Sequence, residues 1–234
     1  MPTDVGPFEL FYAGFVQHPI LLWLAALAAG AYCGRLKGVQ SRMQIYCAAL
    51  VVLSVLDAWL TSNEILGIGR LPVGLSSSVP LFFVLAGDFR YLLLVSAATP
   101  GGGLELTPVR LIAALGLTAI VPLLSQVLLS VLPASLNTPR TLYLVYELMF
   151  VVLTLSLLRF ARSVGEAAWL QRVSRFVLFY YGLWATADVI ILATGSDLGF
   201  ALRVVPNLLY YGGLIAVIGR ESSHAVASPS RAVA

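Results

Sequence analysis

Residues 78–98 read SVPLFFVLAGDFRYLLLVSAA, an apolar run that carries Asp88 and Arg90 near its centre. A helix needs about 20 apolar residues to cross the hydrocarbon core of a bilayer, which is roughly 30 Å thick. This run is long enough, and Pro72 before it and Pro100 after it mark turns. The stretch is therefore predicted to be a transmembrane helix with two ionisable groups inside the membrane.

Six further segments of the same kind surround this helix in the chain. Of the 234 residues, 59% are hydrophobic and only 11% are charged, against roughly a quarter charged in soluble domains. The mean hydropathy is +0.93. These values exclude disordered, collagen-like, disulfide-rich and nucleic-acid-binding proteins. We predict an all-α polytopic membrane protein, a bundle of seven transmembrane helices at 11–34, 44–62, 78–98, 109–132, 141–160, 173–194 and 200–219.

Lysine and arginine residues are unevenly distributed between the two sides of this bundle. Of the 14, only Arg70, Arg140 and Arg203 fall on one side, ten fall on the other, and Arg90 lies within a predicted span. Because cytoplasmic loops carry an excess of these residues, the N-terminus is predicted outside and the C-terminus inside, in the cell membrane. Residues 1–220 are predicted to form a single transmembrane domain, followed by a disordered cytoplasmic tail at 221–234.

The chain offers few side chains that could hold a metal or cofactor. His18 and His224 are its only histidines, and neither has a cysteine or second histidine close in sequence. Cys33 and Cys47 flank a short loop that we place in the reducing cytoplasm, which argues against a disulfide. We therefore predict no metal site, no cofactor and no nucleic-acid partner.

Ionisable and amide side chains inside the predicted spans gather in one layer. Most lie roughly 8 to 10 Å from the outer ends of their helices, at a rise of about 1.5 Å per residue. Such residues are costly inside a membrane, so each is a candidate functional residue. Because they come from six helices, we predict that they converge on a pocket open to the outside. The residues of this layer are Asp57, Asp88, Arg90, Gln126, Glu147, Asp188 and Asn207.

Acids outnumber bases in this layer, since four carboxylates share it with one or two guanidiniums. Arg90 follows Asp88 by two residues, so the two side chains point in different directions on a helix. We expect Arg90 to bridge to an acid on a neighbouring helix instead. A buried carboxylate left without a cation tends to hold a proton. The surplus of acids predicts a site that attracts cations or exchanges protons.

Aromatic residues lie near these polar residues in the sequence. Trp59, Trp184 and Tyr210 are either the walls of a pocket that binds a cation through its aromatic faces or part of an interfacial aromatic belt. For Tyr143 and Tyr211 the belt is the better interpretation. The polar residues themselves have a structural alternative, since interhelical hydrogen bonds contribute about 1 kcal/mol each. Asp197 is expected to be a solvated loop charge.

These features favour a multi-pass protein whose outward-facing pocket binds or senses a small cationic or amphiphilic ligand. A proton- or ion-coupled small-molecule transporter is the alternative. A second alternative is an intramembrane lipid hydrolase that uses paired carboxylates, which is less favoured because no nucleophile–base pair is visible. A purely structural subunit is the fourth. The expected partners are the lipid bilayer, a small-molecule ligand, and a partner membrane protein or a second copy of the chain.

Overall fold

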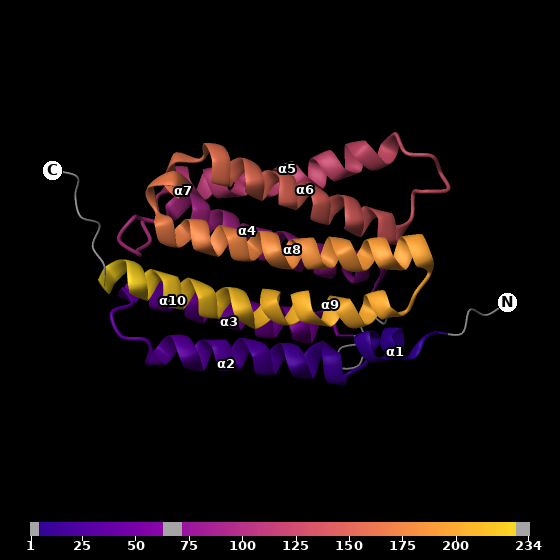
Figure 1. Ribbon diagram of the computed structural model, residues 1–234, viewed down its shortest axis with the longest axis horizontal. Helices are drawn as coiled ribbons and strands as arrows, with labels where there is room; N and C mark the ends of the chain where they lie inside the picture. Colours follow the sequence, from indigo (N-terminus) through magenta and orange to yellow (C-terminus); the bar gives the residue numbers. More distant parts are fainter. Residues whose placement is uncertain (1–4, 63–71, 228–234) are drawn as a thin grey trace.

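The computed structural model describes residues 5–62 and 72–227. Within these ranges the helices run side by side along the longest axis of the molecule (Figure 1). Seven helical segments are long and apolar enough to cross a membrane. The predicted all-α bundle of seven spans is therefore confirmed, and the chain is a multi-pass membrane protein. Its orientation stays a prediction, and Arg70 and residues 228–234 of the predicted tail lie outside the described residues.

Two of the seven spans contain a π-helical segment. The first joins η1 (Val16–Leu21) to α2 (Leu22–Arg35), and the last joins α9 (Leu198–Leu208), η3 (Leu209–Gly213) and α10 (Leu214–Ala227). The short helices α1 (Pro7–Ala13) and α7 (Arg162–Glu166) lie near opposite ends of the bundle (Figure 1). The remaining spans are α3 (Ser41–Leu60), α4 (Val73–Ala97), α5 (Pro108–Ser130), α6 (Pro139–Phe160) and α8 (Ala168–Thr194).

Two spans extend further than the apolar pattern predicts. Helix α8 begins at Ala168, five residues before the predicted start at 173, and its Trp169 is buried. Helix α10 continues to Ala227, so residues 221–227 are helical and not part of a disordered tail. Ser222 of this extension is fully buried, and its carbonyl lies against Gly102 in the loop after α4. Packing against that loop explains why small polar residues stay helical here.

Helices α5 and α6 begin at the same local sequence signal, a threonine followed by a proline. The Thr107 hydroxyl accepts a hydrogen bond from the Arg110 amide, and the Thr138 hydroxyl accepts one from the Thr141 amide. Each threonine thus satisfies an amide that the first helical turn leaves free, and the proline that follows has no amide to satisfy. The residue at which each of these two helices begins is therefore determined by its local sequence.

The bundle is closed at the end where α2 stops at Arg35, which we call the inner end after the predicted orientation. The second half of α4 is buried there, and its Tyr91 hydroxyl hydrogen bonds to Ser174 over 2.9 Å. The Trp169 indole donates to the Thr99 carbonyl over 2.9 Å. The loop after α4 is thereby held against the bundle, while a separate hollow lies between α2 and α3 beside Cys33 and Cys47.

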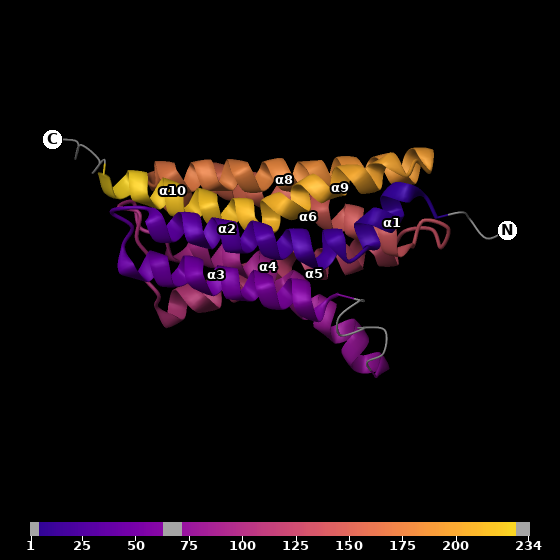
Figure 2. The same ribbon diagram turned by 90° about the horizontal axis from the view of Figure 1, so that it is seen from below.

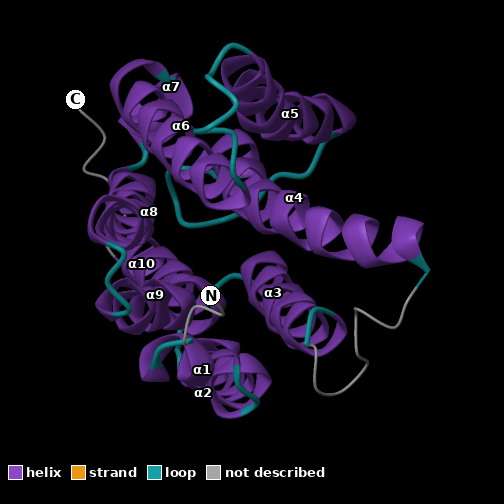
Figure 3. Cartoon of the chain, turned by 90° about the vertical axis from the view of Figure 1, so that its right-hand side faces the viewer, coloured by secondary structure: helices purple, strands orange, loops and turns teal. Residues whose placement is uncertain are grey.

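The other end, where α4 begins at Val73, is more open. We call it the cavity end, because the cavity described below lies there. Figure 3 views the bundle from this side and Figure 2 from below, and in both the first turns of α4 diverge from the other helices. Apolar side chains face outward elsewhere, for example Ile112, Leu123 and Val127 on α5. Because a bilayer surrounds the spans, these side chains contact lipid tails.

The helix that contains η3 approaches α2 closely at one glycine. A Cβ atom built at Gly212 would lie 2.5 Å from the Ala25 carbonyl oxygen, which is backbone and cannot rotate away. Small residues at such positions let two transmembrane helices pack backbone to backbone. This contact holds η3 against α2.

Gly212→Ala is therefore expected to lower the stability of the bundle. Overpacking of this kind typically costs about 1 to 3 kcal/mol. The control is Gly116→Ala on α5, where no atom of another described helix lies within 4 Å of the added methyl group. Thermal unfolding of both variants in detergent measures the difference. Equal midpoints for the two variants would contradict the close packing of η3 on α2.

Candidate functional site

A cavity of about 260 Å³ lies between the helices at the cavity end of the bundle. Side chains from α1, η1, α2, α3, α4, α6, α8, α9 and η3 line it. Helix α5 contributes none of the lining residues, and its Gln126 is exposed beside a separate hollow. The structure thus brings most of the predicted polar layer together but leaves Gln126 out. The predicted site residues that line the cavity are Asp57, Asp88, Glu147, Trp184, Asn207 and Tyr210.

Three predicted site residues do not line the cavity. Trp59 is 40% exposed on the outside of α3, so it contributes nothing to the pocket wall. Arg90 and Asp188 are buried behind the wall, with 3% and 0% exposure. Each contacts a side chain that does line the cavity: Arg90 lies over the Tyr210 ring, and Asp188 pairs with Arg203.

Asp88 is held on the cavity wall by two tyrosine hydroxyls. Tyr146 of α6 donates to one carboxylate oxygen, and Tyr181 of α8 donates to the other. Asp88 itself is 2% exposed. Among the described residues no guanidinium or ammonium group bonds to it, so its partners are both neutral hydroxyls. Tyr181 could have been found from the sequence, because Tyr181, Trp184 and Asp188 follow the i, i+3, i+7 spacing of one helix face.

Asp57 on α3 has a similar environment. The Tyr211 hydroxyl donates to one of its oxygens over 2.7 Å, and the Thr61 hydroxyl lies 3.4 Å from the other. The Thr61 oxygen also lies 3.2 Å from Nε2 of His18. Tyr211 is buried and bonded to an acid, so its assignment to an interfacial belt is wrong; Tyr143, which is 49% exposed, lines the cavity.

Arg90 does not bridge to an acid, contrary to the prediction. Its guanidinium donates to the Tyr210 carbonyl over 2.8 Å and to the Ser54 hydroxyl over 3.2 Å, and lies 3.7 Å from the centre of the Tyr210 ring. A π-helical turn such as η3 interrupts the regular carbonyl ladder of a helix. The Tyr210 carbonyl lies in this turn and accepts from the buried cation, a partnership that sequence spacing does not reveal.

Tyr210 also depends on a glycine of the facing helix. Its hydroxyl lies where a Cβ atom of Gly87 would be, so any larger residue at 87 would displace the ring. The ring lies 5.2 Å from the Trp184 ring and 5.2 Å from the Tyr211 ring, measured between centroids. One set of contacts therefore positions the aromatic wall and the Arg90 guanidinium together.

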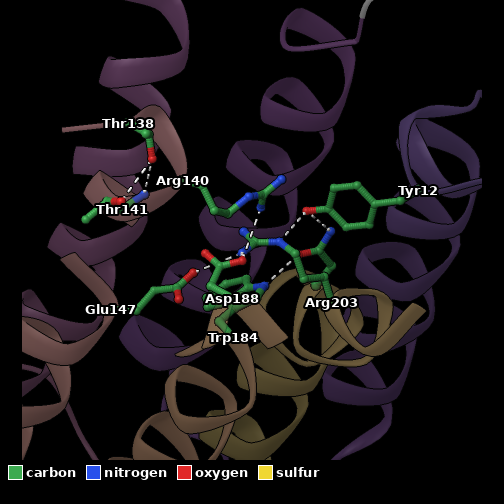
Figure 4. Close-up of polar contacts among 9 residues, drawn as sticks. Tyr12, Thr138, Arg140, Thr141, Glu147, Trp184, Asp188 and Arg203 are labelled. Atoms are coloured by element: carbon green, nitrogen blue, oxygen red, sulfur yellow. Dashed lines mark hydrogen bonds and ion pairs between the residues drawn. The ribbon is translucent and has the colours of Figure 1, made fainter. Parts of the chain in front are cut away.

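A second group of charges includes Glu147 and Arg203 of the cavity wall, and Figure 4 shows its contacts. Arg203 of α9 forms ion pairs with Asp188 and, over 3.4 Å, with Glu147. Arg140 reaches the same Asp188 oxygen over 3.1 Å. Two guanidiniums thus meet two carboxylates, and the group is balanced in charge. The other oxygen of Glu147 and the other oxygen of Asp188 are buried without a hydrogen-bond partner among the described residues.

Helix α1 contributes a residue that sequence reasoning missed. The Tyr12 hydroxyl accepts hydrogen bonds from Arg203 over 3.2 Å and from Asn207 over 3.3 Å. Asp197 holds the start of α1, because its carboxylate accepts from the Phe8 amide over 2.7 Å and from the next amide over 2.8 Å. The expectation that Asp197 is a solvated loop charge is therefore wrong.

The fold and the cavity define a polytopic membrane protein with charged and aromatic side chains gathered among its spans. No protein-family model matches the chain, and neither a curated protein nor a solved structure matches it. The function is therefore argued from the chemistry of the cavity.

Arg203→Met is expected to destabilise the protein strongly, because it leaves Glu147 without its bonded cation and Asp188 with Arg140 alone. Removing one partner of a buried pair typically costs about 3 to 5 kcal/mol. The control is Arg162→Met, since Arg162 pairs with Glu166 at the surface and is largely exposed. Thermal unfolding in detergent should show a large loss for the first variant and little change for the second. Similar losses would contradict the structural importance of the buried group.

Proposed function

We propose that the protein binds a small cationic ligand in this cavity, on the predicted outer side of the membrane. One observation carries the proposal. Asp57 and Asp88 both line the cavity, and among the described residues neither is bonded to a cationic side chain. Buried carboxylates are costly unless a positive charge or a proton balances them. A positively charged ligand supplies that charge.

The aromatic wall supports the same ligand chemistry. Trp184 and Tyr181 lie together on α8 with their ring centres 5.4 Å apart, and both line the cavity. Aromatic faces attract cations, by about 2 kcal/mol or more where water is excluded. Tyr181 and Tyr146 donate to Asp88, so their rings adjoin its negative charge. An ammonium group in the cavity would meet carboxylate and aromatic faces at once.

The cavity volume limits the size of the ligand. A volume of about 260 Å³ lies just below the roughly 300 to 1,000 Å³ of typical small-molecule pockets. The cavity is therefore suited to a compact ligand. This favours a small amine over an amphiphile with a long acyl chain.

The transport alternative needs a second opening for the ligand. Below the cavity, Arg90 is fixed by Tyr210 and Ser54, and the Tyr46 hydroxyl donates to the Arg90 carbonyl. Deeper still, Tyr91 bonds to Ser174. These contacts close the floor of the cavity in this conformation, which supports binding or sensing over transport.

The hydrolase alternative gains a hydroxyl–imidazole contact, that of Thr61 and His18. A nucleophile must give its proton to the base. The Thr61 hydroxyl instead donates to the Asp57 carbonyl over 2.6 Å, so its oxygen is the acceptor toward His18. This geometry supports a hydrogen bond in the cavity wall and not an activated nucleophile.

Binding of 2-phenylethylammonium, compared with the uncharged 2-phenylethanol of the same size, tests the proposal. In titration calorimetry on the purified full chain, we expect the ammonium to bind about 10- to 100-fold more tightly, because it forms a charge-assisted hydrogen bond. Asp88→Asn should remove about tenfold or more of this preference and leave the binding of the alcohol unchanged.

The matched control is Glu105→Gln, the same change at a carboxylate that is half exposed and paired with Arg110 near the inner end. It should leave both affinities as they are. Equal binding of the two compounds, or no binding of either, would contradict the proposed function.

A further inference from the structure

We propose that the ligand is a monovalent ammonium ion that enters the cavity in exchange for one proton held by the Asp57–Asp88 pair. The inference rests on the proposed function and adds to it the charge of the ligand and the proton released on binding. It follows from counting the charged groups that face each carboxylate.

The groups that face Asp57 come from four elements. Thr61 caps its own helix, Tyr210 and Tyr211 come from η3, and His18 of η1 reaches it through Thr61. The only positive side chain that acts on Asp57 among the described residues is Arg90 of α4, without a hydrogen bond between them. The bonded neighbours of Asp57 are therefore neutral hydroxyls.

The charged and titratable side chains that face Asp88 are of similar kinds. Its own helix supplies Arg90, α6 supplies Tyr146, α8 supplies Tyr181, and η3 supplies Tyr210. The charge of Arg90 thus serves both carboxylates, and it is the one guanidinium that does so among the described residues. The other two guanidiniums described above, the buried Arg203 and the partly exposed Arg140, are bonded to Asp188, and Arg203 also pairs with Glu147.

Two carboxylates that share one guanidinium leave a single negative charge. In a medium of low dielectric such a charge is neutralised by a proton when no cation is bound. A monovalent ammonium replaces that proton, and the total charge of the cavity stays the same. In the exchange the O–H bond of the carboxyl group breaks, the proton leaves for bulk water, and the ammonium takes its place.

The geometry also indicates where the ammonium lies. One face of the Tyr210 ring is covered by the Arg90 guanidinium, so a second cation is repelled from it. The Asp57 oxygen beside Thr61 has only a 3.4 Å hydroxyl contact and remains free to accept a strong hydrogen bond. An ammonium group with N–H donors is therefore favoured near Asp57, and its organic part can lie against Trp184.

Calorimetry in buffers of different ionisation enthalpy measures the exchange directly. Binding of 2-phenylethylammonium to the full chain in detergent should release about one proton at every pH at which the free protein holds that proton. Because protons compete with the ligand, the Kd should fall as the pH rises, by up to about tenfold per pH unit. Binding without net proton release across that range of pH would overturn the exchange and leave the proposed function standing.

Variants identify the group that releases the proton. Asp57→Asn and Asp88→Asn each leave one carboxylate against Arg90, so proton release should disappear and the affinity for the ammonium should fall about tenfold or more. The Glu105→Gln variant should release about one proton when the ammonium binds, as the unaltered chain does. Loss of the release in His18→Gln, with release retained in both aspartate variants, would overturn the assignment to the carboxylate pair.

Binding of uncharged 2-phenylethanol shows whether the cavity of each aspartate variant is intact. If neither compound binds to the unaltered chain, the proposed function itself fails. That result is distinct from binding without proton release, which removes only the exchange.

Discussion

The need to balance every buried charge inside the bundle is the constraint on which the rest of the structure depends. A membrane offers no water to its spans, so a charged side chain must find its partners within the protein. Arg203 and Arg140 satisfy this need for Asp188 and Glu147 and thereby join α6, α8 and α9. Arg90 satisfies it differently, through a carbonyl and the face of Tyr210. Asp57 and Asp88, whose hydrogen-bond partners are neutral hydroxyls, lie on the cavity wall.

The backbone provides the geometry for this arrangement. The π-helical η3 places Tyr210 over Arg90, and Gly87 leaves room for the Tyr210 hydroxyl on the facing helix. Gly212 brings η3 against α2, and Trp169 holds the loop after α4 against the bundle. The hydrogen bonds of Arg90 and Tyr91 lie between the cavity and the opposite end of the bundle.

Much of the fold could be predicted, whereas the site could be predicted only in part. The seven spans follow from apolar length, and even the starts of α5 and α6 follow from Thr107 and Thr138. Depth along each helix placed Asp57, Glu147 and Asp188 at a similar level and Asp88 near the midplane, but it carries no information on how each helix is rotated. Rotation is why Trp59 faces outward and why Tyr211, expected at the interface, meets an acid.

Composition and spacing by themselves determined the class of protein, the number of spans and the depth of the acids, because hydrophobicity and helical rise are local properties. Only the tertiary structure decided which charges meet. Arg203 is 15 residues from Asp188 but 56 from Glu147, and Arg90 lies 120 residues from the carbonyl that it binds. Such partnerships depend on the order and rotation of helices in the bundle, which arise from packing between distant segments.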